Sequence, residues 1–232
     1  MITGGGDVMP FYLVCDVSWS MRDELPTLRN GISHIKEQIR YDPVLGSAAM
    51  VGIITFADTA EVPMRLGRLG DSRIPDINCA GLVQPNYGAA FETLADEWER
   101  DYGRLTDSGH RLYRPCAYFL TAGEPSDWDW EDTLDQTLSI EALSSVGVPR
   151  YPILAPFGFR DATESTLRRL AYPEGESRWY HAKSASFEDA LVGLLGIIMN
   201  SLVSTGNTLR GGGFGPVLPP SDDPDISSGT AA

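Results

Sequence analysis

The chain has 232 residues, 42% of them hydrophobic, and a formal net charge of -14 at pH 7. This length and apolar content suit one sizeable α/β domain with a full core. No basic patch is available to neutralise phosphates, so we expect no nucleic-acid partner and no anionic membrane surface. A basic protein face or a divalent cation fits the charge better, although acidity can also serve solubility alone.

The cysteine pattern and the two chain ends bear on location. Cys15, Cys79 and Cys116 are scattered and form no C-x-x-C pair, so neither a zinc site nor a disulfide framework is indicated. Residues 1–8 are Gly-rich, lack the basic and apolar regions of a signal peptide, and are expected to be flexible. The apolar tract 191–203 is too short to span a bilayer. We predict a cytoplasmic protein.

The first half of the chain alternates apolar runs with a helical repeat. Residues 11–15 form an apolar strand, and an amphipathic helix follows from Pro26 with apolar residues at helical spacing. Residues 49–56 predict a second buried strand. Residues 61–66 predict a short antiparallel edge strand, because Pro63 would interrupt a central ladder.

The second half continues the alternation. Helices are predicted around residues 91–98, over 130–145, over 164–171 and in a final apolar segment, with strands over 116–120, 148–157 and 179–181. This order predicts an α/β, doubly wound, mostly parallel sheet with helices on both faces and one short antiparallel edge strand. The domain is expected to span 9–206, and the Gly/Pro/Asp-rich segment 207–232 reads as a flexible tail.

A cluster of hard oxygen ligands directly follows the first strand. Asp16, Ser18 and Ser20 alternate along the chain, so all three side chains can face the same way. Such ligands suit Mg²⁺ or Mn²⁺, and open α/β sheets bind ligands at the carboxyl ends of their strands. The alternative is that the three side chains tie the loop backbone and cap the next helix.

These residues, with three further segments, resemble the von Willebrand factor A (vWA) family. The resemblance rests on the D-x-S-x-S motif at Asp16, the strand 49–56, the segment 85–91 and the segment 117–127, in family order over roughly residues 9–204. It is closest to the bacterial tellurium-resistance (TerY-like) branch. The resemblance implies a metal-ion-dependent adhesion site whose metal is completed by an acidic residue of a partner protein.

Two positions depart from the family pattern. Pro85 stands where the second metal loop normally offers Thr, and Ala122 stands where the third loop normally offers Asp. Mg²⁺ needs carboxylate charge to hold it, so the site reads as degenerate, with Asn86, Glu124 and Asp127 as possible replacement ligands.

A loop rich in acids and tryptophan forms a second candidate site. Trp128, Asp129 and Trp130 lie among further carboxylates, and with Trp19 and Tyr87 they are predicted to share one end of the sheet. Aromatic anchors rimmed by acids suit a protein-binding surface that prefers a basic partner. The alternative is an acidic helix N-terminus with one tryptophan packed beneath it.

No catalytic motif accompanies these features. G-x-S-x-G, H-E-x-x-H and P-loop patterns are absent, and the three histidines are dispersed. We therefore predict a non-enzymatic interaction module. By resemblance it would act as a scaffold or adaptor in a bacterial stress-response system, alongside a protein kinase and a phosphatase. The alternatives are a structural subunit of a larger assembly or a metal-dependent hydrolase, for which Ala122 removes the obvious second carboxylate.

Overall fold

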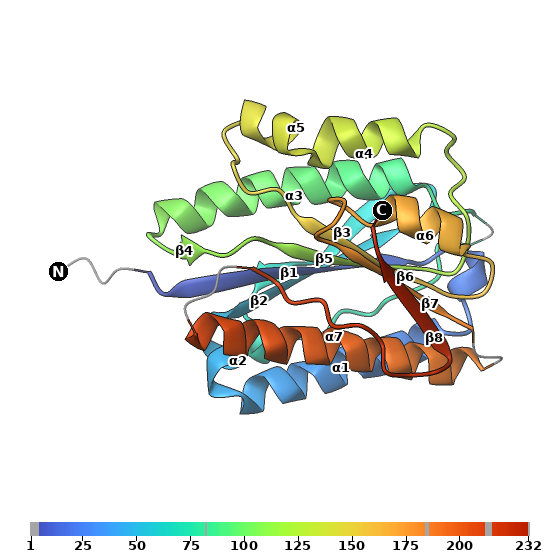
Figure 1. The fold of residues 1–232 in the computed structure, drawn as a ribbon, viewed down its shortest axis with the longest axis horizontal. Coiled ribbons are helices and arrows are strands. Elements are labelled where there is room, and N and C mark those ends of the chain that lie inside the picture. The colour runs from blue at the N-terminus through green and yellow to red at the C-terminus, as the bar shows by residue number, and fades with distance from the viewer. Residues whose placement is uncertain (1–4, 82, 184–185, 212–214, 232) are drawn as a thin grey trace.

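The molecule is built on one mixed sheet (Figure 1). The structure, a computed structural model, describes residues 5–81, 83–183, 186–211 and 215–231. Its strands run in the order β3-β2-β1-β5-β6-β7-β8, with β4 paired to the start of β1. The strands are β1 (Asp7–Asp16), β2 (Ala49–Phe56), β3 (Ala60–Gly67), β4 (Arg111–Leu112), β5 (Cys116–Thr121), β6 (Ile153–Gly158), β7 (Arg178–Ala182) and β8 (Ile226–Thr230).

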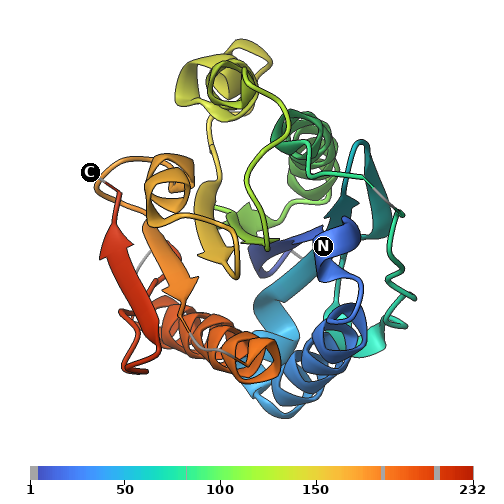
Figure 2. The same ribbon diagram turned by 90° about the vertical axis from the view of Figure 1, so that its right-hand side faces the viewer.

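The strand directions confirm the predicted fold class. Strand β1 is central and parallel to both β2 and β5, and the parallel set continues through β6 and β7. Strand β3 is the predicted antiparallel edge. Because the parallel strands all end on one side, the loops that follow them gather at a single end of the sheet, onto which Figure 2 looks.

Helices cover both faces of this sheet (Figure 1). One layer holds α3, α4 and α5, the opposite layer holds α1, α2 and α7, and α6 packs against β6 and β7. Their bounds are α1 (Leu25–Tyr41), α2 (Pro43–Ala48), α3 (Tyr87–Asp107), α4 (Trp130–Leu138), α5 (Ile140–Ser145), α6 (Glu164–Leu170) and α7 (Phe187–Arg210).

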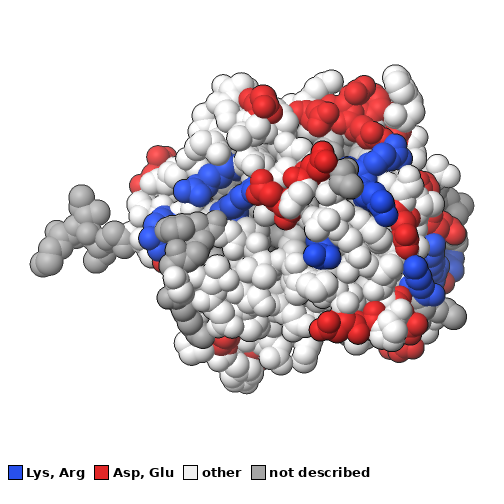
Figure 3. Space-filling view, viewed as in Figure 1, with Lys and Arg blue, Asp and Glu red and all other residues white. Residues whose placement is uncertain are grey.

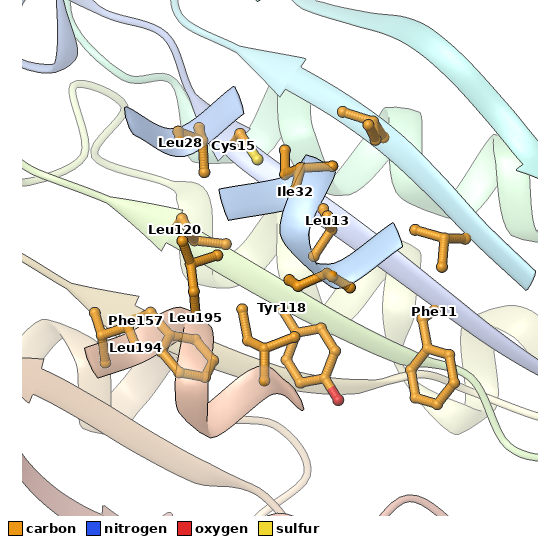
Figure 4. Close-up of a cluster of buried hydrophobic side chains, with 14 of the residues drawn as sticks. Phe11, Leu13, Cys15, Leu28, Ile32, Tyr118, Leu120, Phe157, Leu194 and Leu195 are labelled. Atoms are coloured by element: carbon orange, nitrogen blue, oxygen red, sulfur yellow. The ribbon is translucent and has the colours of Figure 1, made fainter. Parts of the chain in front are cut away.

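The central strand has apolar side chains on both faces because both are covered. Phe11, Leu13 and Cys15 join the core beneath α1 and α7, where Figure 4 shows them beside side chains of both helices. Tyr12 and Val14 alternate with them and join the core beneath α3. Fully burying a side chain of this size contributes about 1.5–3 kcal/mol, so β1 anchors the loop that follows it.

Side-chain caps set where two short helices, α5 and α2, begin. The helix expected over 130–145 is two helices, because Ser139 leaves the helical conformation and its hydroxyl accepts a hydrogen bond from the Ala142 N–H at 3.1 Å. Asp42 starts α2, the short helix between α1 and β2, because its carboxylate accepts hydrogen bonds from the N–H groups of Val44 and Leu45.

The segment after α7 corrects the expectation of a flexible tail. Strand β8 pairs antiparallel with β7 and closes the other edge of the sheet. The Val217 N–H donates to the Thr205 hydroxyl at 2.9 Å, and the Tyr180 hydroxyl donates to the Pro219 carbonyl at 2.6 Å. Ile226 is buried against α7. Backbone pairing and one apolar anchor therefore hold this segment on the domain.

The flexible segment predicted over residues 1–8 belongs in part to strand β1. Residues 1–4 lie outside the described residues, whereas Asp7 and Val8 already belong to β1. The Asp7 carboxylate is paired with Arg111, beside the short strand β4. The ordered sheet therefore begins before residue 9.

Helix α7 is apolar enough to cross a membrane by length and composition over Glu188–Thr208, with a mean hydropathy of 1.4. Of that stretch, 56% is buried inside the fold. Its apolar face packs against α1 and the sheet, as a core helix of a globular domain does.

Candidate functional site

Asp16 lies at the carboxyl end of the central strand and is fully buried. One carboxylate oxygen accepts a hydrogen bond from the Ser18 N–H at 2.8 Å. The other accepts from the Thr121 hydroxyl at 3.0 Å and from the Ala122 N–H at 3.3 Å. Burial raises the pKa of Asp16 above its ordinary value, and the accepted hydrogen bonds offset this only in part. Asp16 thus ties its own loop to the end of β5.

The two serines of the motif stay next to Asp16. Ser18 is buried and precedes a short 3-10 helix, Trp19–Met21. The hydroxyl oxygens of Ser18 and Ser20 are 3.0 Å apart, within hydrogen-bond distance. The structure therefore brings together the three residues that the sequence motif grouped.

The three predicted replacement ligands are engaged elsewhere. Asn86 caps α3 by accepting from the Ala89 N–H at 2.9 Å. The two oxygens of Asp127 accept from the N–H groups of Tyr87 and Gly88, at 2.9 and 2.7 Å, and so cap the same helix from a different loop.

Glu124 caps a second helix in the same manner. Its carboxylate accepts from the Thr163 N–H at 2.7 Å and from the Thr166 hydroxyl at 2.5 Å, at the start of α6. All three side chains thus satisfy helix N-termini, whose first N–H groups lack partners within the helix. Each side chain therefore already has hydrogen-bond partners at a helix start, away from the Asp16 carboxylate.

The positions of the missing ligands contribute backbone atoms only. The Pro85 carbonyl accepts from the N–H and the hydroxyl of Ser126, at 2.8 and 3.1 Å. Ala122 is fully buried, and its N–H donates a hydrogen bond to the Asp16 carboxylate. Among the described residues no group of three or more His, Cys, Asp or Glu side chains could hold a metal ion.

This donor set does not fit a tightly held Mg²⁺ or Mn²⁺. Asp16 brings one carboxylate, already hydrogen-bonded at both oxygens, and the serine pair adds only neutral oxygens. Mg²⁺ dehydrates reluctantly and is held by carboxylate charge. The D-x-S-x-S loop therefore has the sequence of a metal-binding loop, but its hydrogen bonds hold the loop to the end of β5.

Two of the five predicted partner contacts are wrong because they are buried. Tyr87 is fully buried, packs edge-on against Phe119, and donates its hydroxyl proton to the Gly123 carbonyl at 2.8 Å. Trp130 is 3% exposed and packs against Tyr87 and Phe91. Both rings support the loops from beneath, so neither offers area to a partner.

The other three predicted contacts lie on the surface. Trp128 is 91% exposed and Trp19 is 44% exposed. Asp129 beside Trp128 is exposed as well. The Arg22 guanidinium lies 4.0 Å from the centre of the Trp19 ring, which fixes that ring by a cation–π contact.

Sequence reasoning missed an arginine that crosses this end of the sheet. Arg160 follows β6 with a φ of 46°, a left-handed conformation that is uncommon outside glycine and asparagine. Its guanidinium pairs with the Glu24 carboxylate and donates to the Ser20 carbonyl at 3.1 Å. Its position directly after a buried strand was the available signal. It clamps the Ser20 loop from the neighbouring β6–α6 connection.

Comparison with known proteins places the fold. No protein-family model and no curated protein sequence matches this chain. Among solved structures, the ArnB paralog VWA2 from Sulfolobus acidocaldarius matches with a TM-score of 0.57 and 16% identity, over 84% of this chain and 45% of that one. The open pilus adhesin SpaC from Lactobacillus rhamnosus GG matches with a TM-score of 0.62 and 14% identity, over 86% and 30% respectively.

A third structural neighbour carries a metal. Proximal thread matrix protein 1 from the mussel byssus, with a zinc-occupied MIDAS motif, matches with a TM-score of 0.54 and 12% identity, over 86% of this chain and 49% of that one. The chain thus has a vWA fold and spans less than half the length of these proteins. A divalent metal occupies the MIDAS motif of one protein of this fold.

Proposed function

We propose that this protein is a non-enzymatic interaction module that binds another protein through the loops at the carboxyl end of its sheet. The observation that carries the proposal is Trp128, which is 91% exposed on a loop fixed at several points. Exposing a large aromatic ring to water is unfavourable, and a partner that covers the ring removes this cost. Tryptophan is one of the residues enriched in binding hot spots.

The loop that presents Trp128 is fixed before any partner arrives. Asp127 bonds two N–H groups of α3, and the Ser126 N–H donates to the Pro85 carbonyl. Trp130 anchors the loop from the core side. Preorganisation of this kind lowers the ordering cost of association, so a fixed tryptophan binds more strongly than a mobile one.

The charge around Trp128 favours a basic partner. Asp129 and Asp132 are exposed on either side of Trp130, and acidic side chains gather over α4 in Figure 3. Complementary charge raises association rates and selects between partners more than it adds affinity. A positively charged partner surface is therefore the match that this face supports.

In this proposal the interaction does not require a tightly bound Mg²⁺ or Mn²⁺. The Asp16 carboxylate is committed to the Ser18 and Ala122 N–H groups and to the Thr121 hydroxyl. A partner's acidic residue completing a metal is the arrangement that the family resemblance implies, and this donor set supports it weakly. A hydrolase would additionally need a second carboxylate at the same place.

The pathway we propose rests on the sequence resemblance. The similarity of the motif sequences to the TerY-like branch supports a scaffold or adaptor of the tellurium-resistance type in a bacterial stress response, with a kinase and a phosphatase as partners. Location in the cytoplasm is supported by free thiols at Cys15 and Cys116, where burial raises the pKa of each to about 12. Such thiols stay protonated and fit a reducing compartment.

The test is capture of partners by cross-linking from extracts of the source cells. Trp128→Ala is compared with the wild type and with Tyr41→Ala, which removes another exposed aromatic ring at the far end of α1. We expect Trp128→Ala to lose the captured partner and Tyr41→Ala to keep it. Retention of the same partner by Trp128→Ala would contradict the proposal.

One observation favours the alternative of a structural subunit. A groove of about 790 Å³ runs between α1 and α7, and Val192 and Val203 are exposed along it. If assembly uses this groove, Val192→Asp would abolish the captured complex and Trp128→Ala would leave it intact. The same cross-linking experiment therefore separates the two functions.

A further inference from the structure

A small pocket opens beside the Asp16 loop, between the β2–β3 hairpin and the segment 76–80. It has a volume of about 280 Å³. Val17, Ala57, Pro63 and Ile77 supply apolar wall, and the polar lining is Thr55, Thr59, Glu61, Asp76 and Asn78. We call it the Thr55 pocket. The Ala80 N–H donates to the Val17 carbonyl at 2.9 Å and so joins its wall to the Asp16 loop.

Thr55, a buried residue, brings a hydroxyl to this pocket. The residue is 7% exposed, and its hydroxyl has no hydrogen-bond partner among the described residues. It lies on β2 in the alternation that also turns Ile53 and Ala57 toward the α1 side of the sheet. The hydroxyl is not one of the atoms that are shut off from water, so it opens into the pocket and is available to bond a ligand there.

Glu61 adds a carboxylate on the same face. It pairs with Thr55 across the β2–β3 ladder, and directly opposed residues of an antiparallel pair place their side chains side by side. Within the described part of the chain Glu61 has no ion pair or side-chain hydrogen bond. Asp76 across the pocket is already paired with Arg29 at 2.8 Å. The charge of Asp76 is therefore partly neutralised by Arg29, whereas the charge of Glu61 is not neutralised by an ion pair.

The lining selects the sign and size of the ligand. No Lys or Arg lines the pocket, and two carboxylates do, so an anion is repelled and a cation is attracted. A volume of about 280 Å³ is far larger than a metal ion needs and suits a long side chain. The apolar walls match the aliphatic stem of such a side chain, and the oxygen atoms of Thr55, Glu61 and Asn78 match its charged head.

We propose that the Thr55 pocket binds a basic side chain, arginine or lysine, of the partner protein. This inference rests on the proposed function and names the chemistry of one contact within it. The guanidinium or ammonium group donates to the Glu61 carboxylate and to the Thr55 hydroxyl oxygen, while the stem packs against Val17 and Ile77. The pocket then supplies the specificity for a basic partner, beside the area contributed by Trp19 and Trp128.

The test uses a small probe and needs no identified partner. Isotope-labelled protein is titrated with N-acetyl-arginine amide while backbone amide signals are followed by NMR, and N-acetyl-citrulline amide serves as the neutral control of the same shape. We expect saturable shifts at Thr59, Glu61 and Asn78 with a millimolar Kd for the arginine probe, and none for citrulline. The lysine analogue is expected to shift the same signals.

Two variants locate the binding. Glu61→Gln removes the charge and Thr55→Val removes the hydroxyl at nearly constant shape, and each should weaken the arginine probe by about fivefold. Glu37→Gln, an exposed glutamate on α1 outside the pocket, should leave binding unchanged. Equal shifts with citrulline, no saturable shifts at these residues, or unchanged affinity in Glu61→Gln would overturn the inference.

The outcome is independent of the test of the proposed function. Trp128 does not line the pocket, so Trp128→Ala should bind the arginine probe as the wild type does. Loss of partner capture in Trp128→Ala without probe binding in the wild type would keep the interaction module and refute the pocket. Probe binding with normal capture by Trp128→Ala would refute the Trp128 face and keep the pocket.

Discussion

Replacing Asp127 with alanine should destabilise the protein, because this side chain caps α3 from outside the helix. Its two oxygens accept from the N–H groups of Tyr87 and Gly88 at 2.9 and 2.7 Å. Hydrogen bonds to a charged acceptor contribute about 1.5–3 kcal/mol each when sheltered. Asp127 is half-buried, so water replaces part of the loss, and we expect a decrease of about 2 kcal/mol in the free energy of unfolding.

Urea unfolding followed by circular dichroism measures this change. For a chain of this size, a loss of about 2 kcal/mol also lowers the Tm by about 4–8 °C. Asp129→Ala is the matched control, because Asp129 is an exposed acid two residues away whose side chain makes no cap hydrogen bond. Equal stability of the two variants would refute the reasoning. So would a loss for Asp127→Ala that appeared only when Mg²⁺ was present, since that would make Asp127 a metal ligand.

Three further predictions concern side chains that hold the loops and edges of the sheet. Because burial raises the native pKa of Asp16, the contribution of this residue to stability is greatest below its unfolded pKa of about 3.9 and declines as pH rises through the native pKa. In urea unfolding, the stability of the wild type should therefore fall relative to that of Asp16→Asn over this pH range. A stability difference that does not change with pH would contradict the prediction. Ile226→Ala should cost about 2–3 kcal/mol by opening a cavity against α7 near Gly193, and an unchanged Tm would show that β8 adds nothing to the fold. Arg160→Ala should lower the free energy of unfolding by about 1–2 kcal/mol, less than the loss of a fully buried ion pair because the guanidinium is 44% exposed. Adding Glu24→Gln to Arg160→Ala should recover part of this loss. No recovery would mean that the unpaired Glu24 charge is not its cause.

The central strands could be predicted from sequence because their pattern reports burial on both faces. Residues 11–15 and 49–56 are apolar runs too short for a core helix, and they form neighbouring parallel strands of the sheet. The edge strand was identified from Pro63. In each case the local sequence carried the information that the fold uses.

Strand β8 could not be predicted in this way. Its sequence, Ile-Ser-Ser-Gly-Thr, has one apolar residue and follows a Pro/Asp-rich stretch that is typical of disorder. Pairing with β7 supplies the backbone hydrogen bonds that its side chains do not encode. The structure formed here depends on an available sheet edge, which only the tertiary fold reveals.

The candidate site shows the same division between local pattern and tertiary context. The grouping of Asp16, Ser18 and Ser20 followed from their spacing, and the structure keeps them together. Whether Tyr87 and Trp130 faced solvent depended on rings from other strands and helices, chiefly Phe119 and Phe91, that pack against them. Loop aromatic residues near a sheet end are equally able to bind a partner or to close the core.

We propose that this protein of vWA fold binds a partner protein at the carboxyl end of its sheet, and that hydrogen bonds rather than a metal ion hold the Asp16 loop. Calorimetric titration of Mg²⁺ and Mn²⁺ into chelator-stripped protein, with Asp16→Ala alongside, measures whether a metal ion binds at this loop. We expect no saturable heat at millimolar metal for either protein. Micromolar binding by the wild type that Asp16→Ala abolishes would contradict the claim and would make Asp16 the ligand of a working metal site.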